Sequence, residues 1–350
     1  MRKRRPSRTR RRSWPRSRAC GKRSRSCAGA ERDDSNRYNK PMNRSGMLKL
    51  VGNTPLVELA ALAPKRGVRI FAKLEGQNPT GSIKDRVALA LVEAAERRGD
   101  LKPGDTIVEA SSGNTGVALA FVAKQRGYKA HIVLPRGVAP SIYDILRMYD
   151  VEMTWCEADG GMKRAIDTAQ ELASSRGFKL LGQFTEQANV DVHYSTTGPE
   201  IVKELPEVDV FIAGIGTSGT IMGVGKRLRE TRPNVRIIGI EPKLGERLQG
   251  LRSLEEGFLP PLLDLKALDG RFIVDSASAF ECARRVARAE GILAGASAGA
   301  TLHVAFTVAE RIEKGNIVVM FADGGWKYLP SRPWDASERR DEELDEVHWW

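Results

Sequence analysis

Long apolar segments are missing from this sequence, and cysteine is scarce. No apolar run approaches the roughly 18 residues that a membrane-spanning helix needs, so the chain is not expected to act in a membrane. The four cysteines, at positions 20, 27, 156 and 282, show neither C-x-x-C pairing nor a spacing typical of zinc sites. The sequence therefore predicts no metal site, and it favours a reducing, cytoplasmic compartment.

Beyond its first segment, the chain also lacks the basic excess that is typical of nucleic-acid-binding proteins. Residues 1–46 hold 17 Lys and Arg against three Asp and Glu. The other 304 residues hold 39 Lys and Arg against 41 Asp and Glu. The net charge of +12 therefore comes from one short segment. Nucleic acid is not an expected partner of the rest of the chain.

Residues 1–46 have too few apolar side chains to build a core, so we expect a disordered basic extension. Three roles remain open. The extension could bind nucleic acid or another anionic surface, serve as an organellar transit peptide, or result from start-site choice, with Met42 or Met47 close to the true start. We favour a dispensable extension.

Apolar runs of strand length alternate with helical patterns from about residue 54 onward. Buried strands are expected at 69–75, 106–111, 129–135, 151–157, 208–216, 235–242 and 316–323, with helices between them at 116–126, 162–176, 220–230 and 279–290. This alternation predicts an α/β fold in which helices cover both faces of parallel sheets. A polar tail, 331–350, ends in Trp349 and Trp350.

The segment "NPTGSIKDR" places a lysine, Lys84, at the start of an expected helix. Ser82 is a suitable N-cap, and Asp85 completes a capping box, so Lys84 is expected to be about the second helical residue. The unpaired N–H groups and the positive end of the helix dipole there favour the neutral amine. Such a lysine suits a nucleophile or a Schiff base, although a solvated lysine remains the alternative.

Two polar loops follow predicted strands, where α/β sheets collect their ligands. In "EASSGNTG", Ser111, Ser112, Asn114 and Thr115 gather at a helix start, and their donors would suit a carboxylate. Simple N-capping of that helix by Ser112 or Asn114 is the alternative.

The second loop, "AGIGTSGTIMG", contains the glycine pattern G-x-G-x-x-G, with Glu241 at the end of the next strand. This pattern and acid are typical of an NAD-dependent oxidoreductase, a different class of enzyme. A single phosphate is the other possible ligand, because Thr217, Ser218 and Thr220 add hydroxyl donors to the backbone N–H groups.

A third loop, "GILAGASAGATLH", places Ser297 before another helix. By itself it indicates little more than a helix cap. Together, however, the loops supply a lysine of low pKa, a cradle for one phosphate and a cradle for a carboxylate. Pyridoxal phosphate (PLP) carrying an amino acid requires all three.

From about Leu48 to Leu329 the chain resembles the cysteine synthase family, the O-acetylserine and O-phosphoserine sulfhydrylases of the fold type II PLP enzymes. The motifs that carry the resemblance are "VGNTPLVEL", "NPTGSIKDR", "SSGNTG", "TTGPEI", "FIAGIGTSGT" and "GASAGA". The resemblance implies two doubly wound parallel α/β domains, 47–185 and 186–330, with the cofactor in the cleft between them. It also implies a homodimer.

The resemblance assigns a role to each candidate residue. Lys84 would form the internal aldimine and act as the catalytic base. The other cofactor contacts would be Asn114 at the ring hydroxyl, Ser297 at the ring nitrogen, and Gly216, Thr217, Ser218, Gly219 and Thr220 at the phosphate. The substrate carboxylate would be held by Ser111, Ser112, Thr115 and Gln183.

The implied reaction converts O-phosphoserine or O-acetylserine, through an aminoacrylate, to L-cysteine. Its sulfur would come from sulfide or a sulfur-carrier protein. Residues 241–260 and "DGGWKYL" are most similar to the cysteine synthase B branch. This resemblance implies that Arg252 reaches the acidic group of the donor. An arginine on the solvent-exposed surface is the alternative.

The sequence also departs from the family. Ser111 replaces a usual threonine, and "FTEQAN" replaces the usual "FxNPAN", which puts the substrate in doubt. A cystathionine β-synthase-like enzyme or another PLP β-lyase stays an alternative.

Overall fold

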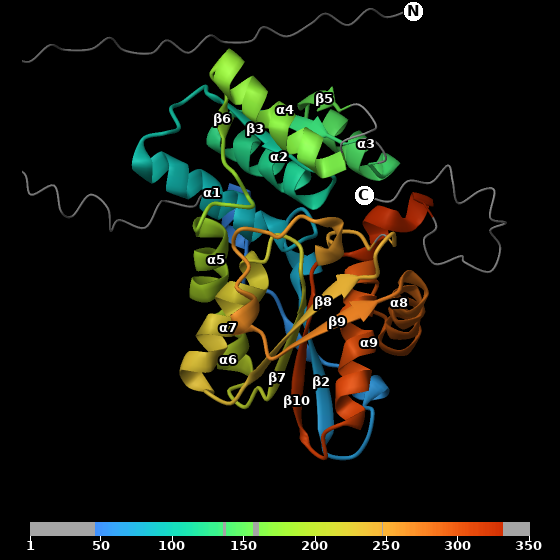
Figure 1. Ribbon diagram of the computed structural model, residues 1–350. Helices are drawn as coiled ribbons and strands as arrows, with labels where there is room; N and C mark the ends of the chain where they lie inside the picture. The colour runs from blue at the N-terminus through green and yellow to red at the C-terminus, as the bar shows by residue number, and fades with distance from the viewer. Residues whose placement is uncertain (1–45, 136–137, 157–160, 247, 332–350) are drawn as a thin grey trace, which may run out of the picture. The chain divides into compact units, whose positions relative to one another are not determined.

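The computed structural model describes residues 46–331 apart from 136–137, 157–160 and 247. Its strands form two sheets, each covered by helices on both faces (Figure 1). Nearly all of the basic extension and of the C-terminal tail, including Trp349 and Trp350, lie outside the described residues. In the part that the structure describes, no helix is long and apolar enough to span a membrane.

The smaller sheet has the order β5-β4-β3-β6, and its strands are parallel. They are β3 (Thr106–Ala110), β4 (Lys129–Leu134), β5 (Glu152–Trp155) and β6 (Lys179–Leu180). Its faces pack on α1 (Lys84–Arg98), α2 (Asn114–Arg126) and α3 (Pro140–Met148) on one side and on α4 (Gly161–Arg176) on the other. Within β3, Ile107 joins the first core and Val108 the second, because side chains of a strand alternate between faces.

The larger sheet has the order β1-β2-β10-β7-β8-β9, and only β1 runs antiparallel to its neighbour. Its strands are β1 (Leu56–Glu58), β2 (Val68–Leu74), β7 (Val210–Gly214), β8 (Arg236–Pro242), β9 (Gly270–Val274) and β10 (Gly315–Phe321). β10 shows the two-sided burial of a central strand: Ile317 and Val319 pack in one core, Val318 and Met320 in the other.

Helices from the C-terminal half of the chain cover the larger sheet (Figure 1). One face packs on α8 (Ser276–Glu290) and α9 (Ala296–Glu310), and the other on α6 (Gly198–Glu204) and α7 (Gly219–Thr231). Before α6, a short helix α5 (Ala188–Val192) passes into a π-helical turn, η6 (His193–Thr197). The remaining short helices are η2 (Gly46–Leu50), η3 (Ala60–Leu62), η4 (Glu75–Gln77), η7 (Leu254–Glu256), η8 (Leu265–Ala267) and η9 (Gly325–Ser331).

The boundary predicted between residues 185 and 186 does not separate the strands of the smaller sheet from those of the larger sheet. β1 and β2 precede that point, yet β2 pairs along its whole length with β10, from Val68 opposite Gly315 to Leu74 opposite Phe321. β2 is mostly buried and needs cover on both faces, which the C-terminal helices supply. The ranges 47–185 and 186–330 stay a prediction about folding units.

Candidate active site

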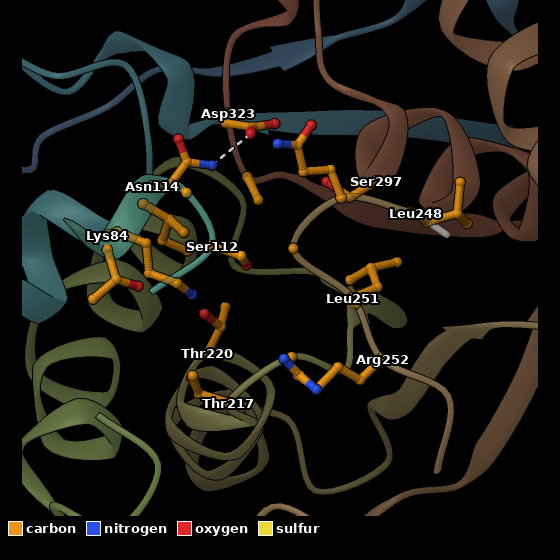
Figure 2. Close-up of a pocket in the computed structure, with 18 of the residues that line it drawn as sticks. Lys84, Ser112, Asn114, Thr217, Thr220, Leu248, Leu251, Arg252, Ser297 and Asp323 are labelled. Carbon is orange, nitrogen blue, oxygen red and sulfur yellow. Dashed lines mark hydrogen bonds between the residues drawn. The ribbon is translucent and has the colours of Figure 1, made fainter. Parts of the chain in front are cut away.

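One pocket collects the polar loops of both sheets (Figure 2). It is lined by the start of α1 and by the loops that follow β3, β7 and β10 at their carboxyl ends. Parallel strands bring such loops to one edge of a sheet, so the topology explains why segments far apart in sequence meet there. Of the predicted site residues, only Gly219 does not line the pocket itself.

Lys84 enters the pocket from a loop that the neighbouring backbone holds in place. Ile83 N donates a hydrogen bond to Ala322 O at 2.8 Å, and the backbones of Ser82 and Asp323 form an isolated antiparallel β-bridge. Lys84 is the first residue of α1, one position earlier than predicted. The lysine loop is therefore fixed against the segment that follows β10.

The predicted capping box between Ser82 and Asp85 is wrong. No side chain caps the start of α1 at its N-cap residue. Asp85 instead accepts hydrogen bonds from Thr80, from the backbone N–H at 2.6 Å and from the hydroxyl. The Ser82 hydroxyl accepts from Lys84 N at 3.3 Å rather than from Asp85 N, which donates to Ser82 O at 3.3 Å, so neither half of the box forms.

Burial lowers the pKa of the Lys84 amine to about 8, although the nearby Asp323 carboxylate acts to raise it. The lowered pKa predicted from the helix start is confirmed in direction, with burial as its largest cause. A buried amine of this kind loses its proton more readily than one in water. Lys84 can therefore be a neutral nucleophile near neutral pH.

The "SSGNTG" loop leads from β3 into α2, and its first serine holds the loop together. Ser111 Oγ accepts hydrogen bonds from Gly113 N at 3.1 Å and Gly116 N at 2.8 Å. Ser111 is buried, so its hydroxyl is already used by the loop. Ser112 lies in the pocket wall, and its side chain has no hydrogen-bond partner among the described residues.

Thr115 and Gln183 meet in the same wall, 68 positions apart in sequence. Thr115 Oγ1 donates to Gln183 Oε1 at 2.7 Å, and Gln183 Nε2 donates to Ala110 O at 3.0 Å. The Glu109 carboxylate, with a pKa that burial raises to about 7, accepts from Gly182 N at 2.9 Å. The glutamine loop is thus fastened to the end of β3.

The loop between β7 and α7 is closely packed around its glycines. A Cβ on Gly216 would lie 2.5 Å from Gly250 O, and one on Gly219 would lie 2.0 Å from Asn189 Oδ1. Ser218 adopts a φ of 71°, a strained value for a residue other than glycine. Only glycine fits at Gly216 and Gly219, because a side chain there would overlap Gly250 or Asn189.

This loop has the donors that a phosphate requires. Ser218 Oγ is buried without a partner among the described residues. Thr217 Oγ1 accepts from Asn189 Nδ2 at 2.9 Å, and Thr220 Oγ1 lies 3.3 Å from His193 Nε2. The unpartnered hydroxyl at the start of a 13-residue helix fits one phosphate group. The donor set and the lysine of low pKa together fit PLP.

Ser297 and Asn114 lie on a further part of the wall (Figure 2). Ser297 is in the first turn of α9 and is buried. Asn114 begins α2, and its amide nitrogen donates to Asp323 Oδ2 at 2.7 Å. Both side chains point into the pocket, as we expect of two residues that belong to the same site.

Arg252 is half-buried and lies beside two aromatic rings that contact each other. Its guanidinium carbon lies 6.0 Å from the Phe184 ring centre and 5.9 Å from that of Phe258. Burial lowers the pKa of Arg252, an effect that Glu256 opposes, and no ion pair holds the guanidinium within the described residues. Figure 2 shows it directed into the pocket, so a solvated surface arginine does not describe it.

Sequence reasoning missed Asp323, Lys327 and His193. Asp323 lines the pocket, Lys327 is buried behind it, and His193 supports Thr220 from the π-helical turn. Asp323 follows a predicted strand as closely as Ser111 does, so the rule that selected the other loops could have found it. No signal in the sequence pointed to the π-helical turn.

The NAD hypothesis depended on Glu241, and that side chain faces away from the pocket. It is fully buried, accepts from Leu254 N at 2.5 Å and pairs with Arg271 at 3.0 Å. A ribose-binding acid must be open to its ligand, and Glu241 is occupied by protein. The described residues also contain no group of three or more metal-ligating side chains.

Comparison with known proteins identifies the family. A family model described as pyridoxal-phosphate-dependent enzyme matches residues 47–323. The chain is 41% identical over 300 residues to a cysteine synthase of Staphylococcus aureus, covering 83% of this chain and 96% of that one. It is 38% identical over 286 residues to cysteine synthase B of Pseudomonas aeruginosa, covering 81% and 96%.

A solved structure of an O-ureido-L-serine synthase matches with a TM-score of 0.80 and 37% identity, over 87% of this chain and 99% of that one. These matches confirm the resemblance and the fold type II architecture that it implied. The chain belongs to the cysteine synthase family of PLP-dependent enzymes, and its cofactor is PLP.

Proposed function

We propose that the chain is a cysteine synthase that replaces the β-substituent of O-phosphoserine or O-acetylserine with sulfur. One observation carries the proposal: a single pocket joins a lysine of pKa about 8, the glycine-rich loop at 216–220 and the loop that leads into α2. The relatives that are named cysteine synthase support the same reaction.

The loop 216–220 would hold the cofactor phosphate through its backbone N–H groups and hydroxyls, with Asn114 and Ser297 beside the ring. When bound, the cofactor supplies an electron sink for the charge left at the substrate α-carbon. A hydroxyl at Ser297 cannot keep a ring nitrogen charged as a carboxylate would. The weaker sink suits elimination and addition better than transamination.

Lys84 would bind the cofactor covalently and, once substrate displaces it, remove the α-proton at Nζ. Its lowered pKa leaves a useful fraction of neutral amine at physiological pH. Ser112, Thr115 and Gln183 would bind the substrate carboxylate at the start of α2. Ser111 would act by holding that loop in shape, because its hydroxyl accepts two of the loop N–H groups.

Arg252 would bind the leaving group of the donor. Its guanidinium is partly desolvated, has no ion-pair partner in the described part of the chain and lies in the pocket wall. A guanidinium binds phosphate through two parallel hydrogen bonds, which a neutral acetyl ester cannot match. We therefore propose O-phosphoserine as the preferred donor.

The test is cysteine formation by the PLP-loaded protein from each donor with sulfide. Cysteine from either donor supports the proposed reaction, and a higher kcat/KM with O-phosphoserine supports the preference. Cystathionine from serine and homocysteine, with no cysteine from either donor, would favour the cystathionine β-synthase-like alternative.

We further propose a cytoplasmic homodimer that takes sulfur from sulfide or from a carrier protein. The basis is the likeness to the family. Sedimentation of the purified protein tests the dimer, and a comparison of sulfide with a thiocarboxylated carrier tests the sulfur source.

A further inference from the structure

A buried lysine that the proposed reaction does not use lies behind the pocket. Lys327 in η9 has a side chain only 1% exposed, and its Nζ donates a hydrogen bond to Asn114 Oδ1 at 2.6 Å. It makes no ion pair within the described residues. A buried cation is costly unless its surroundings compensate for lost water. Burial lowers the pKa of the Lys327 amine, whereas the nearby Asp323 and Asp85 carboxylates act to raise it, so the surroundings compensate in part.

The backbone around Lys327 is anchored, which fixes where its side chain begins. Ser141 Oγ donates to Lys327 O. Gly324 N donates to Gly81 O at 3.1 Å, and Gly325 N donates to Leu293 O at 3.0 Å. The segment that carries Lys327 is therefore held by α3 and by the loops that precede α1 and α9.

The Asn114 amide lies between a cation and a carboxylate. Its oxygen accepts from Lys327, and its nitrogen donates to Asp323 Oδ2 at 2.7 Å and to the Tyr328 hydroxyl oxygen at 3.2 Å. A flipped amide would place its NH2 against the ammonium and its oxygen against the carboxylate. The two charges thus define one orientation of the amide.

The ammonium also changes the strength of the amide as a donor. A cation at a carbonyl oxygen withdraws electrons from the amide, so the N–H groups at its other end donate more strongly. Asn114 lines the pocket, and its NH2 donates to Asp323 and, at 3.2 Å, to Tyr328, so a ligand oxygen would accept from this polarised NH2 in place of the Tyr328 hydroxyl.

We propose that Lys327 is a positioning residue that fixes and polarises the Asn114 amide for the oxygen on the PLP ring. The inference rests on the proposed function, in which Asn114 contacts that ring. Lys327 touches neither cofactor nor substrate, and it acts only through Asn114.

The experiment compares PLP binding to the unaltered protein, Lys327→Met, Asn114→Ala and the double variant. Methionine keeps the length and removes the charge and the donor. We expect Lys327→Met to weaken PLP binding about tenfold, the scale of one charge-assisted hydrogen bond, and to shift the balance between the visible and near-ultraviolet bands of the bound cofactor. In the Asn114→Ala background, Lys327→Met should have no further effect on either measurement.

Lys73→Met is the matched control. Lys73 is equally buried but pairs with Glu200 at 2.9 Å, away from Asn114. It should lower the melting temperature while leaving the cofactor bands unchanged. Lys327→Arg, which keeps a cation and donors, should retain the spectrum.

Unchanged PLP affinity and spectrum in Lys327→Met, or effects that simply add to those of Asn114→Ala, would overturn the inference. If the methionine variant does not fold, Lys327→Gln replaces it in the same comparison, judged by the same two outcomes. Absence of PLP binding by the unaltered protein would instead overturn the proposed function.

Discussion

At the scale of single residues, Lys84 should be indispensable for covalent cofactor binding. Lys84→Ala removes the only amine proposed to bond the cofactor, and cysteine formation should fall by about 10²- to 10⁴-fold, the usual contribution of a positioned base. Borohydride reduction followed by denaturation should leave cofactor on the unaltered chain and none on the variant. Cofactor retained by the reduced variant would contradict the assignment.

The lowered pKa of Lys84 predicts how fast cofactor-free protein captures PLP at different pH values. Only the neutral amine attacks, so the capture rate should rise as pH increases and level off above about 8. Rapid-mixing absorbance measurements on the apo-protein test this. A rate that keeps rising toward pH 10 would mean that burial does not lower the pKa.

Arg252 should select between donors. Arg252→Ala should reduce kcat/KM for O-phosphoserine by roughly tenfold to a hundredfold, the loss of a charge-assisted hydrogen bond, with little change for O-acetylserine. The exposed Lys243, changed to Ala, is the control and should affect neither donor strongly. Equal losses for both donors would make Arg252 a structural residue.

At the scale of elements, the turn between β7 and α7 should not accept any side chain at Gly219. A Cβ there would lie 2.0 Å from Asn189 Oδ1 and 2.8 Å from Asn189 O, so the α5 backbone would have to shift. Gly219→Ala should weaken PLP binding and cost about 1 to 3 kcal/mol of stability. Gly270→Ala at the start of β9, where the nearest atom is 3.8 Å away, should be nearly neutral. Equilibrium dialysis and denaturant unfolding measure the two effects.

The elements that sequence predicts best are those with a strong apolar pattern. All seven expected strands are present within a few residues of their predicted bounds. Six of them contain buried residues, whereas the residues of β5 are partly buried or exposed. The missed strands β1 and β6 have three and two residues, too short for any period to show. The missed β9 is an edge strand with alternating exposure.

The sequence predicts the site residues that lie in loops after strands. It does not predict the residues that hold another site residue or loop in place. Lys84 and the loop at 216–220 lie next to strong apolar runs, so their place was evident from sequence. The Ser111 hydroxyl turns back on its own loop, and Lys327 reaches Asn114 only through the fold. The contact between Lys327 and Asn114 joins residues 213 positions apart, which local patterns do not encode.

At the scale of the whole described molecule, a buried ion network ties α1 to the larger sheet. Arg86 pairs with Glu75 and Glu200, both at 2.7 Å, and is 2% exposed. Removing one member leaves buried charges unpaired, so Arg86→Met should destabilise the protein by about 3 to 5 kcal/mol. The exposed pair of Arg229 and Asp269 is the control, and Arg229→Met should cost at most about 1 kcal/mol.

The same network predicts a dependence of stability on pH. Burial by itself would raise the pKa of Glu200, but hydrogen bonds and charge from Arg86 and Lys73 bring it down to about 2. A carboxyl with a lowered folded-state pKa stabilises the protein fully above its unfolded value, near 4.5, and loses this effect as pH falls toward 2. The stability difference between the unaltered protein and Arg86→Met should therefore narrow below about pH 4.5. A constant difference down to pH 2 would contradict the assignment.

The basic extension should be dispensable for catalysis. Its excess charge is confined to residues 1–46, whereas Leu48 is already buried in the core with α1 and α2. A chain that begins at Met42 keeps every described residue, so we expect its kcat/KM for both donors to match that of the full chain. The nucleic-acid alternative has its own measurement, because an arm that neutralises phosphates loses affinity steeply as salt rises. If the full chain binds DNA or RNA with such a slope and the shorter chain does not, the extension is a binding arm; a large loss of turnover in the shorter chain would instead make it part of the enzyme.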